Sequence, residues 1–267
     1  MSISNTKEFV SAGPRRQRLA RLVSERGFLR VTDASAELGV SEVTVRADLS
    51  ALERAGSVVR VHGGAMPVLA DRESSLETSI DRDAAAKRSI GRAAARLVSS
   101  GQSVYVDAGS TAMVLAFALA DRHDLHDVTV VTPGLTIALA LEAALPRFTV
   151  IVTGGTLRPL QHSLVNPFAA PMLDSLNLDI AFIGCNGVHP GRGITNVNLA
   201  EAEIKTRVMA SAASSVLLAD GSKLGRVDLA VIGSVRDFEV LVTAGEAEPG
   251  ILESLGSAGL RVDRVDE

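Results

Sequence analysis

The order of apolar and polar residues near the start of the chain predicts two short helices joined by a glycine turn. A first helix is expected from Thr32 to Leu38, and it ends at the turn residue Gly39. Ser41 can cap the next helix, because its hydroxyl accepts hydrogen bonds from the N–H groups of the first turn. Apolar residues at four- and three-residue spacing mark the inward face of that helix, namely Val45, Leu49 and Leu52. The pattern is that of a helix-turn-helix.

The opposite face of the second helix then points outward. It carries Glu42, Val43, Arg46 and Ala47. An alternating strand from Val58 to His62 follows and enters a turn at Gly63, which predicts a small hairpin beside the helix. Two amphipathic helices around a glycine also occur in proteins that never contact DNA. The added hairpin is what favours a DNA-binding winged helix-turn-helix.

Charge is distributed unevenly along the chain. From Met1 to Met66 ten lysines and arginines stand against seven acidic residues, so this part is at +3. The whole chain is at -4, which leaves -7 for the remainder. This asymmetry is expected if only the first part meets phosphate, although solvated arginines are ordinary on helices.

The pattern changes after Gly101, where short β-rich runs alternate with helix-like stretches. The runs are Val104–Val106, Val128–Val131, Phe148–Val152, Ile180–Ile183, Val216–Ala219 and Val240–Val242. Near-continuous apolar strands of this kind imply a parallel sheet covered on both faces, so we expect an open, doubly wound α/β domain. The stretch from Ser75 to Ser99 reads as a helix that links the two parts.

Ligands of such sheets bind beyond the carboxyl ends of the strands, so the segments after each run are informative. Each of these segments consists mainly of small and polar residues and contains glycine. The segments are Asp107–Thr111, Thr132–Gly134, Thr153–Thr156, Gly184–Gly187 and Asp220–Lys223. In the first, a glycine and two hydroxyls at a strand-to-helix turn offer N–H groups and a helix dipole to an anion. We expect a phosphate there. Turn and capping requirements would also explain any one of these loops alone.

Two lysines add positive charge near these loops. Lys205 follows Glu201 by four residues on the same helix face, and Lys223 follows the last glycine loop. A pair at this spacing is ordinarily a surface ion pair, an explanation that suits Glu201 better than Lys205.

Length and composition bound the remaining possibilities. The chain of 267 residues suits two domains, and its hydrophobic content of 46% is ample for a sizeable core. Cys185 is the only cysteine, which excludes an intrachain disulfide and a cysteine-rich zinc site. The chain has neither a signal peptide nor the roughly 18 uninterrupted apolar residues that span a membrane, so we expect a cytoplasmic protein.

His123 and His126 fit a solvated loop better than a metal site, and we expect no metal and no cofactor.

Several motifs together resemble the DeoR family of transcription regulators. They are Arg16–Leu19, Val40–Leu49 and Arg60–Ala65 in the first part, and Asp107–Thr111, Gly154–Pro159, Asp179–Gly187, Glu201–Lys205 and Ala219–Gly225 in the second. The likeness extends from about Arg15 to Thr243. It implies a winged helix-turn-helix followed by a sensor domain similar in fold to ribose-5-phosphate isomerase and the CoA transferases. In the family that domain senses phosphorylated sugars or related metabolites.

The chain departs from the family pattern at a few positions. Family members usually carry a second arginine where this chain has Ala47, so Arg46 becomes the position expected to set sequence preference. Pro133 stands where the family often has Asn, and Asn166 where it often has Gly. Thr195–Val197 replaces a frequent Thr-Thr-Pro. These last departures bear on which ligand is bound.

The resemblance also implies roles for single residues. The predicted DNA-binding residues are Ser41, Glu42, Val43, Thr44, Arg46, Arg60 and His62. The predicted ligand-binding residues are Asp107, Gly109, Ser110, Thr111, Thr132, Gly154, Gly155, Glu203, Lys205 and Lys223. In this scheme the turn residues 109–111 hold phosphate, the two lysines are cationic partners, and the two acids orient sugar hydroxyls or neighbouring lysines.

We therefore predict a DNA-binding domain over residues 14–68 and a sensor and oligomerisation domain over residues 75–262. The predicted function is a repressor of carbohydrate metabolism genes. Its expected partners are double-stranded operator DNA, a phosphorylated sugar or sugar-alcohol effector, and further copies of the chain in a homodimer or homotetramer, with no membrane. Two alternatives remain. The second domain could be a sugar-phosphate isomerase-like enzyme, since it carries acid-base groups, or it could only dimerise.

Overall fold

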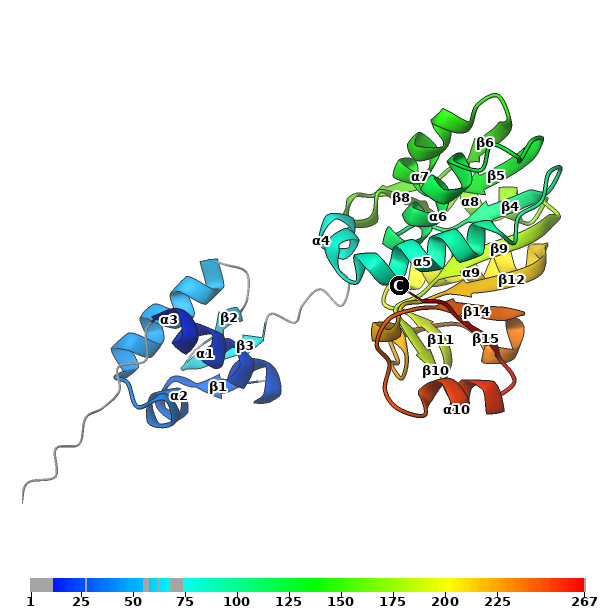
Figure 1. Cartoon of the computed structure of the whole chain (residues 1–267). Helices are drawn as coiled ribbons and strands as arrows, with labels where there is room; N and C mark the ends of the chain where they lie inside the picture. Colours follow the sequence, from blue (N-terminus) through cyan, green and yellow to red (C-terminus); the bar gives the residue numbers. More distant parts are fainter. Residues whose placement is uncertain (1–11, 27, 55–57, 62, 68–73, 267) are drawn as a thin grey trace, which may run out of the picture. The chain divides into compact units, whose positions relative to one another are not determined.

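The computed structural model describes residues 12–26, 28–54, 58–61, 63–67 and 74–266. The chain divides into two compact units, Met1–Arg72 and Glu73–Glu267, called here the N-terminal and C-terminal units. Figure 1 shows their elements. In the described part of the chain, no helix combines the length and the apolar character needed to cross a membrane.

The N-terminal unit is a winged helix-turn-helix, as predicted. Its helices are α1 (Ala12–Arg26), α2 (Val31–Leu38) and α3 (Glu42–Arg54), and its strands are β1 (Leu29–Arg30), β2 (Val58–Val61) and β3 (Gly64–Pro67). The strands form an antiparallel sheet in the order β1-β3-β2. Val45 and Leu49 are at most 1% exposed and pack with Leu19 and Val23 of α1, so the predicted inward face is confirmed.

The C-terminal unit is built on one seven-stranded sheet in the order β15-β14-β12-β9-β4-β5-β6. The strands are β4 (Ser103–Val106), β5 (Val128–Thr132), β6 (Phe148–Val152), β9 (Leu178–Gly184), β12 (Ala212–Leu218), β14 (Val240–Thr243) and β15 (Arg261–Arg264). Every neighbouring pair is parallel. Six of these strands coincide with the six predicted runs, and the expected α/β class is confirmed.

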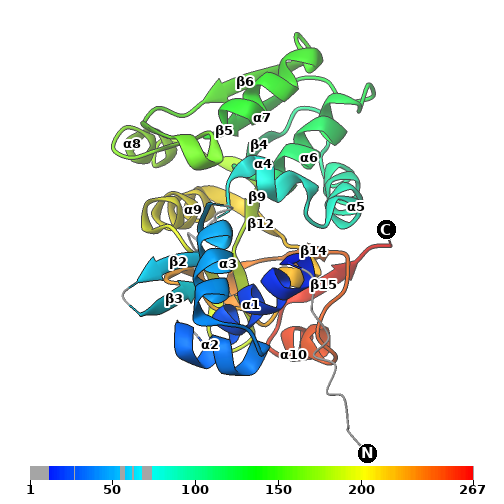
Figure 2. The ribbon, with the colours of Figure 1, turned by 90° about the vertical axis from the view of Figure 1, so that its left-hand side faces the viewer.

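Helices cover both faces of this sheet. On one face lie α5 (Ala84–Ala95), α6 (Ser110–Ala120) and α7 (Leu135–Ala140), packed in one apolar core. On the other lie α8 (Ala169–Leu173), α9 (Leu199–Ser211) and α10 (Ile251–Ser257), packed in a second core. Figure 2 shows α5 and α9 on opposite sides of β9 and β12.

The strand order reverses direction at β4. From β4 the chain proceeds through β5 to β6 at one edge, whereas β9, β12, β14 and β15 continue toward the other edge. The carboxyl ends of β4 and β9 therefore flank a topological switch point, which is where open parallel sheets bind ligands.

One predicted element is wrong in its extent. The single helix expected from Ser75 to Ser99 is two helices, α4 (Leu76–Asp81) and α5, separated at Arg82 and Asp83. Asp83 has a left-handed backbone with φ 51°, which interrupts the helix. The buried Lys87 side chain closes the corner, because its Nζ donates to the Ser79 carbonyl (2.6 Å) and to the Arg82 carbonyl.

Two small antiparallel structures were not predicted. Strands β10 (Gly187–His189), β11 (Gly193–Asn196) and β13 (Ala230–Gly233) form a three-stranded sheet. Strands β7 (Thr156–Arg158) and β8 (Ser163–Val165) form a hairpin around a 3-10 turn at Pro159–Gln161. This segment, residues 156–165, is called the β7–β8 hairpin below.

Candidate DNA-binding and effector-binding sites

The start of α3 is capped as the sequence indicates. Gly39 adopts the left-handed conformation at φ 65° and ends α2. The Ser41 hydroxyl accepts a hydrogen bond from the Thr44 N–H at 3.2 Å and lies 2.9 Å from the Thr44 hydroxyl. Capping of this kind fixes the angle at which α3 leaves the turn.

The outward face of α3 is composed of exposed side chains. Val43 is 72% exposed, and Arg46 and Ala47 are exposed beside it. Arg46 Nη2 donates to Glu42 Oε2 at 2.7 Å across one helical turn. That surface pair is weak, so the guanidinium can leave Glu42 for a DNA base or phosphate.

The wing, which is the hairpin of β2 and β3, is joined to α3 by Arg60. Its Nη1 donates to the Ser50 hydroxyl at 3.0 Å, and its backbone N–H donates to Glu53 Oε1 at 3.2 Å. Strand β2 is thereby held against the C-terminal half of the helix. The predicted contact His62 lies outside the described residues.

A buried carboxylate fastens α1 to α3. Asp48 is 2% exposed and accepts from Arg15 Nε at 2.6 Å and from Arg16 Nε at 2.9 Å. Burial alone raises the pKa of Asp48, but the two arginines outweigh it, so that pKa lies below its ordinary value. Sequence patterning gave no sign that this acid lies inside.

At the switch point, the turn after β4 leads directly into helix α6. Gly109 has φ 107° and precedes α6, and the first helical bond runs from the Met113 N–H to the Gly109 carbonyl at 2.9 Å. The N–H groups of residues 110–112 therefore lack a partner within the helix. Ser110 is only 9% exposed at this turn.

Asp107 and Lys205 form a buried ion pair beside that turn. Lys205 Nζ lies 3.0 Å from Asp107 Oδ2, and the two residues are 5% and 2% exposed. The same carboxylate accepts the Gly184 N–H and the Ala108 N–H, both at 2.9 Å. The pair thus joins the end of β4 to the end of β9.

The Lys205 ammonium is fully coordinated by the protein. Besides Asp107 it donates to the Gly184 carbonyl at 2.9 Å and to Asn196 Oδ1 at 3.0 Å. Burial alone lowers the pKa of Lys205, but the carboxylates of Asp107 and Glu201 raise it more, so its pKa lies above the ordinary value. All three donors of this cation are engaged, which suits a residue that shapes the loops.

The two glutamates of α9 occupy different surroundings. Glu201, interpreted from sequence as a surface residue, is 12% exposed in its side chain and accepts from Arg158 Nη1 and from the Ser163 hydroxyl, the latter at 3.0 Å. Glu203 is exposed and instead contacts Asn166 and Arg207. The four-residue spacing from Glu201 to Lys205 predicts that they share a helix face, but that face is largely buried and not a surface.

The remaining predicted ligand residues line neighbouring loops. Thr132 is fully buried, and its hydroxyl accepts the Gly134 N–H at 3.1 Å. Gly155 is required by packing, because a Cβ there would lie 2.2 Å from the Val165 carbonyl oxygen. Gly154 is exposed, and Lys223 is half-buried at the end of a 3-10 turn after β12.

Cys185 follows β9 in the same region, and burial raises its pKa to about 12. Its thiol therefore stays protonated near neutral pH. By exposure Cys185 is half-buried, so it is less enclosed than the sequence interpretation of a buried thiol expects.

The β7–β8 hairpin is the main feature of the site that the sequence missed. Its Ser163 forms a bridge with Gly134, and Gln161 Oε1 lies 4.0 Å from the point where a Cβ on Gly109 would stand. Through Arg158 and Ser163 it also holds Glu201 of α9. Three-residue strands carry too little periodicity to be recognised.

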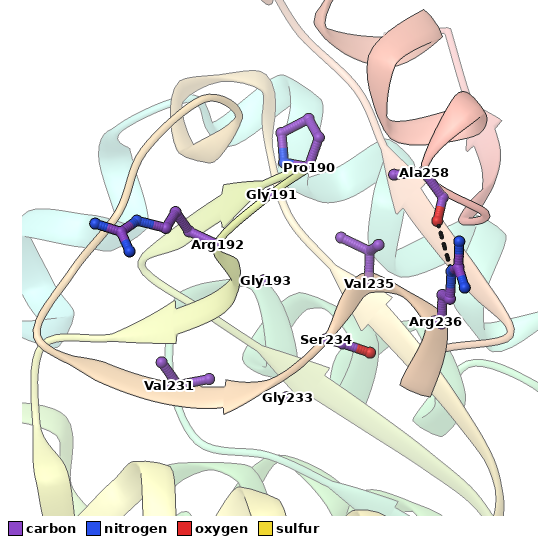
Figure 3. A pocket seen from close by; sticks show the side chains of 10 residues that line it. All are labelled: Pro190, Gly191, Arg192, Gly193, Val231, Gly233, Ser234, Val235, Arg236 and Ala258. Carbon is purple, nitrogen blue, oxygen red and sulfur yellow. Dashed lines mark hydrogen bonds between the residues drawn. The ribbon is translucent and has the colours of Figure 1, made fainter.

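A separate hollow of about 400 Å³ lies at the small sheet, as Figure 3 shows. Arg192 of the turn between β10 and β11 lies on one side and Arg236 on the other. Arg236 Nε donates to the Ala258 carbonyl at 3.1 Å. None of the predicted ligand residues lines this hollow.

These features define the class of protein: a DNA-binding regulator with a winged helix-turn-helix and an attached α/β unit that carries small polar loops at its switch point. Residues 15–68 match the family model of the DeoR-like helix-turn-helix domain, and residues 82–244 match that of the DeoR C terminal sensor domain. The chain belongs to the DeoR family of transcription regulators. Its N-terminal unit binds DNA and its C-terminal unit binds an effector.

Relatives align over almost the full length. The HTH-type transcriptional regulator GlpR of Haloferax volcanii is 34% identical over 249 residues, covering 93% of this chain and 96% of the relative. The glycerol-3-phosphate regulon repressor of Haemophilus influenzae is 28% identical over 241 residues, covering 90% and 92%. Because the family consists of transcription regulators and not enzymes, the isomerase alternative does not hold.

A solved structure of D-ribose-5-phosphate isomerase in complex with phospho-erythronic acid aligns with a TM-score of 0.39 and 16% identity, covering 51% of this chain and 52% of the other.

Proposed function

We propose that the protein is a repressor of carbohydrate metabolism genes and that a phosphorylated sugar or sugar alcohol controls it. The observation that carries the proposal is the turn at Gly109, where the N–H groups of α6 and the buried Ser110 stand beside the Asp107–Lys205 pair. The name of the Haemophilus influenzae relative, a glycerol-3-phosphate regulon repressor, supports a phosphorylated effector. The domains of this regulator are residues 14–68 and 75–262, and it acts in the cytoplasm beside the DNA.

On the DNA side, the exposed face of α3 reads the operator. Val43 and Arg46 meet base edges in the major groove of double-stranded DNA. Thr44, Arg60 and His62 contact phosphate or the groove. Ser41 and Glu42 set the helix start and hold Arg46 in place when DNA is absent.

On the effector side, the backbone of Gly109, Ser110 and Thr111 holds the phosphate group. Lys223 supplies positive charge from the neighbouring loop, whereas Lys205 and Asp107 shape the turn from behind. The loops at Thr132, Gly154 and Gly155 and the acid Glu203 contribute to the rim that meets the sugar hydroxyls.

Operators of helix-turn-helix proteins carry paired half-sites, so we propose at least a homodimer, with a homotetramer as the larger possibility. Sedimentation equilibrium measures this directly. A monomer at concentrations that saturate the DNA would contradict it.

A thermal-shift screen tests the proposed effector class. The full chain is heated with inorganic phosphate, sn-glycerol 3-phosphate, ribose 5-phosphate and hexose phosphates, each beside its unphosphorylated parent. A compound that binds the folded state raises the melting temperature by mass action. The proposal expects a rise with at least one phosphorylated compound and none with its parent. No rise with any phosphorylated compound at millimolar concentration would favour a C-terminal unit that only dimerises.

A further inference from the structure

We propose that Gln161 of the β7–β8 hairpin reports an anion at the Gly109 turn to Ser74, the first described residue after the N-terminal unit. The inference rests on the proposed effector site and adds how its occupancy reaches the chain that leads to the DNA-binding unit. Figure 1 shows β8 beside α4, the helix that begins just after Ser74.

The hairpin is anchored to the loops of the effector site. The Leu135 N–H donates to the His162 carbonyl, and the Leu164 N–H donates to the Pro133 carbonyl, both at 2.9 Å. These bonds tie both sides of residue 163 to the loop after β5. Gln161 is therefore held over the neighbouring turn at Gly109 by short backbone contacts.

The Gln161 amide joins the two places. Its Nε2 donates to the Ser74 carbonyl at 2.7 Å, and its Oε1 faces the Gly109 turn. A carbonyl can only accept a hydrogen bond, so the orientation of this amide is fixed by Ser74: the donor points to the chain entry and the acceptor points to the turn.

A phosphate at the turn reverses that preference. Phosphate oxygens accept hydrogen bonds, so they repel Oε1 and attract the Nε2 donors. When the amide turns its donors to the anion, its oxygen faces the Ser74 carbonyl and the bond at 2.7 Å is lost. Binding at α6 thereby releases the start of α4.

The start of α4 also packs against α6 and makes three further contacts. Ser75 caps the helix by accepting the Thr78 N–H at 3.2 Å, Leu76 is 2% exposed, and His162 Nε2 lies 3.1 Å from Glu77 Oε1 at the surface. The far end of α4 is fixed separately, because Lys87 holds the Ser79 and Arg82 carbonyls. Loss of the Gln161 contact therefore loosens the end that is joined to the N-terminal unit.

Hydrogen exchange measured by mass spectrometry on the full chain tests this. Exchange is followed at residues 75–81 and 110–113, with and without inorganic phosphate, sn-glycerol 3-phosphate or ribose 5-phosphate. In the wild type, an anion should slow exchange at 110–113 and speed it at 75–81 by about threefold to tenfold, the effect of losing one hydrogen bond.

Gln161→Leu removes the donor and keeps the size of the side chain. Its exchange at 75–81 should be fast without any anion and should not change on addition, while residues 110–113 remain protected by the anion. Gln102→Leu is the matched control, because Gln102 accepts the Ser99 N–H in a turn before β4. It should behave as the wild type.

The outcomes separate the two proposals. Protection at 110–113 without faster exchange at 75–81 in the wild type overturns the role of Gln161 and leaves the effector site standing. The same wild-type response in Gln161→Leu also overturns it. No protection at 110–113 with any of the three compounds overturns the effector site and the coupling together.

Discussion

Lys205 is the residue that holds the loops of the proposed effector site together. Its ammonium group joins the ends of β4 and β9 through Asp107 and the Gly184 carbonyl, with Asn196 as its third acceptor. A cation held in this way cannot be removed without leaving a carboxylate buried and unpaired.

Lys205→Met should therefore lower the free energy of unfolding of the C-terminal unit by about 3 to 5 kcal/mol. Urea unfolding followed by the fluorescence of Tyr105 measures this unit alone, because Tyr105 is the only tyrosine and tryptophan is absent. Lys223→Met is the matched control, with an expected change within about 0.5 kcal/mol. Equal effects of the two substitutions would contradict the assigned difference between these lysines.

Asp48 links pH to the stability of the N-terminal unit. Because the folded-state pKa of Asp48 is lowered, its stabilisation is complete above the ordinary carboxyl pKa and is lost as pH falls through the lowered value. Asp48→Asn should cost about 1 to 3 kcal/mol at neutral pH and remove this acid sensitivity. Exchange of α3 amides, compared between pH 6 and pH 3 after correction for intrinsic rates, measures both. Glu42→Gln, which alters only an exposed pair, should leave the acid response intact.

Arg46 is the residue expected to set DNA preference. Arg46→Ala should weaken binding to a selected duplex by about 1 to 3 kcal/mol and relax preference at the contacted base pair. Fluorescence anisotropy with a set of single-base variants of that duplex measures both effects. Arg192→Ala, an exposed arginine of the C-terminal unit, is the control and should bind as the wild type. A uniform loss across all sequences would assign Arg46 to phosphate.

At the scale of elements, the break between α4 and α5 shows how one backbone angle limits a helix. Asp83 has φ 51° and makes no side-chain capping bond. Asp83→Gly should therefore stabilise the C-terminal unit by about 0.5 to 1 kcal/mol, whereas Asp83→Val should destabilise it by about 1 to 2 kcal/mol. The midpoint of urea unfolding by Tyr105 fluorescence tests the pair. A loss of stability in Asp83→Gly relative to the wild type would contradict this and would mean that the turn needs the carboxylate.

Elements could be predicted where burial imposes a pattern. The runs that became β4, β5, β9, β12 and β14 are apolar because both faces of the sheet are covered. Strand β15 was missed for the converse reason. It lies at the edge of the sheet and its residues Arg261–Arg264 are mostly exposed, so pairing with β14 alone determines it.

The parts of the site that could be predicted are the small polar residues directly after the ends of strands. The parts that were missed are contacts between segments far apart in the sequence. The turn at Gly109 stands out in the sequence because a glycine and hydroxyls follow a strand. Nothing local in the sequence indicates that Gln161 reaches Ser74, 87 residues earlier, or that Arg158 reaches Glu201, 43 residues later. Such contacts depend on the tertiary fold.

For the whole molecule, the central claim is that a phosphorylated metabolite held at the start of α6 changes the affinity of the N-terminal unit for DNA. The proposed DNA site and the proposed effector site belong to different compact units of the chain, so the effect is a coupling free energy between two sites. Coupling of this kind typically changes affinity by about fivefold or more. Thr111→Glu places a carboxylate at the α6 turn and excludes the phosphate by like charge.

The most direct measurement is the dissociation constant for a duplex that the protein selects from a random library, determined by fluorescence anisotropy with and without each phosphorylated compound. At least one compound should shift the wild-type dissociation constant about fivefold or more, and Thr111→Glu should no longer respond. A wild-type constant that no phosphorylated compound changes, or an equal response from Thr111→Glu, would contradict it.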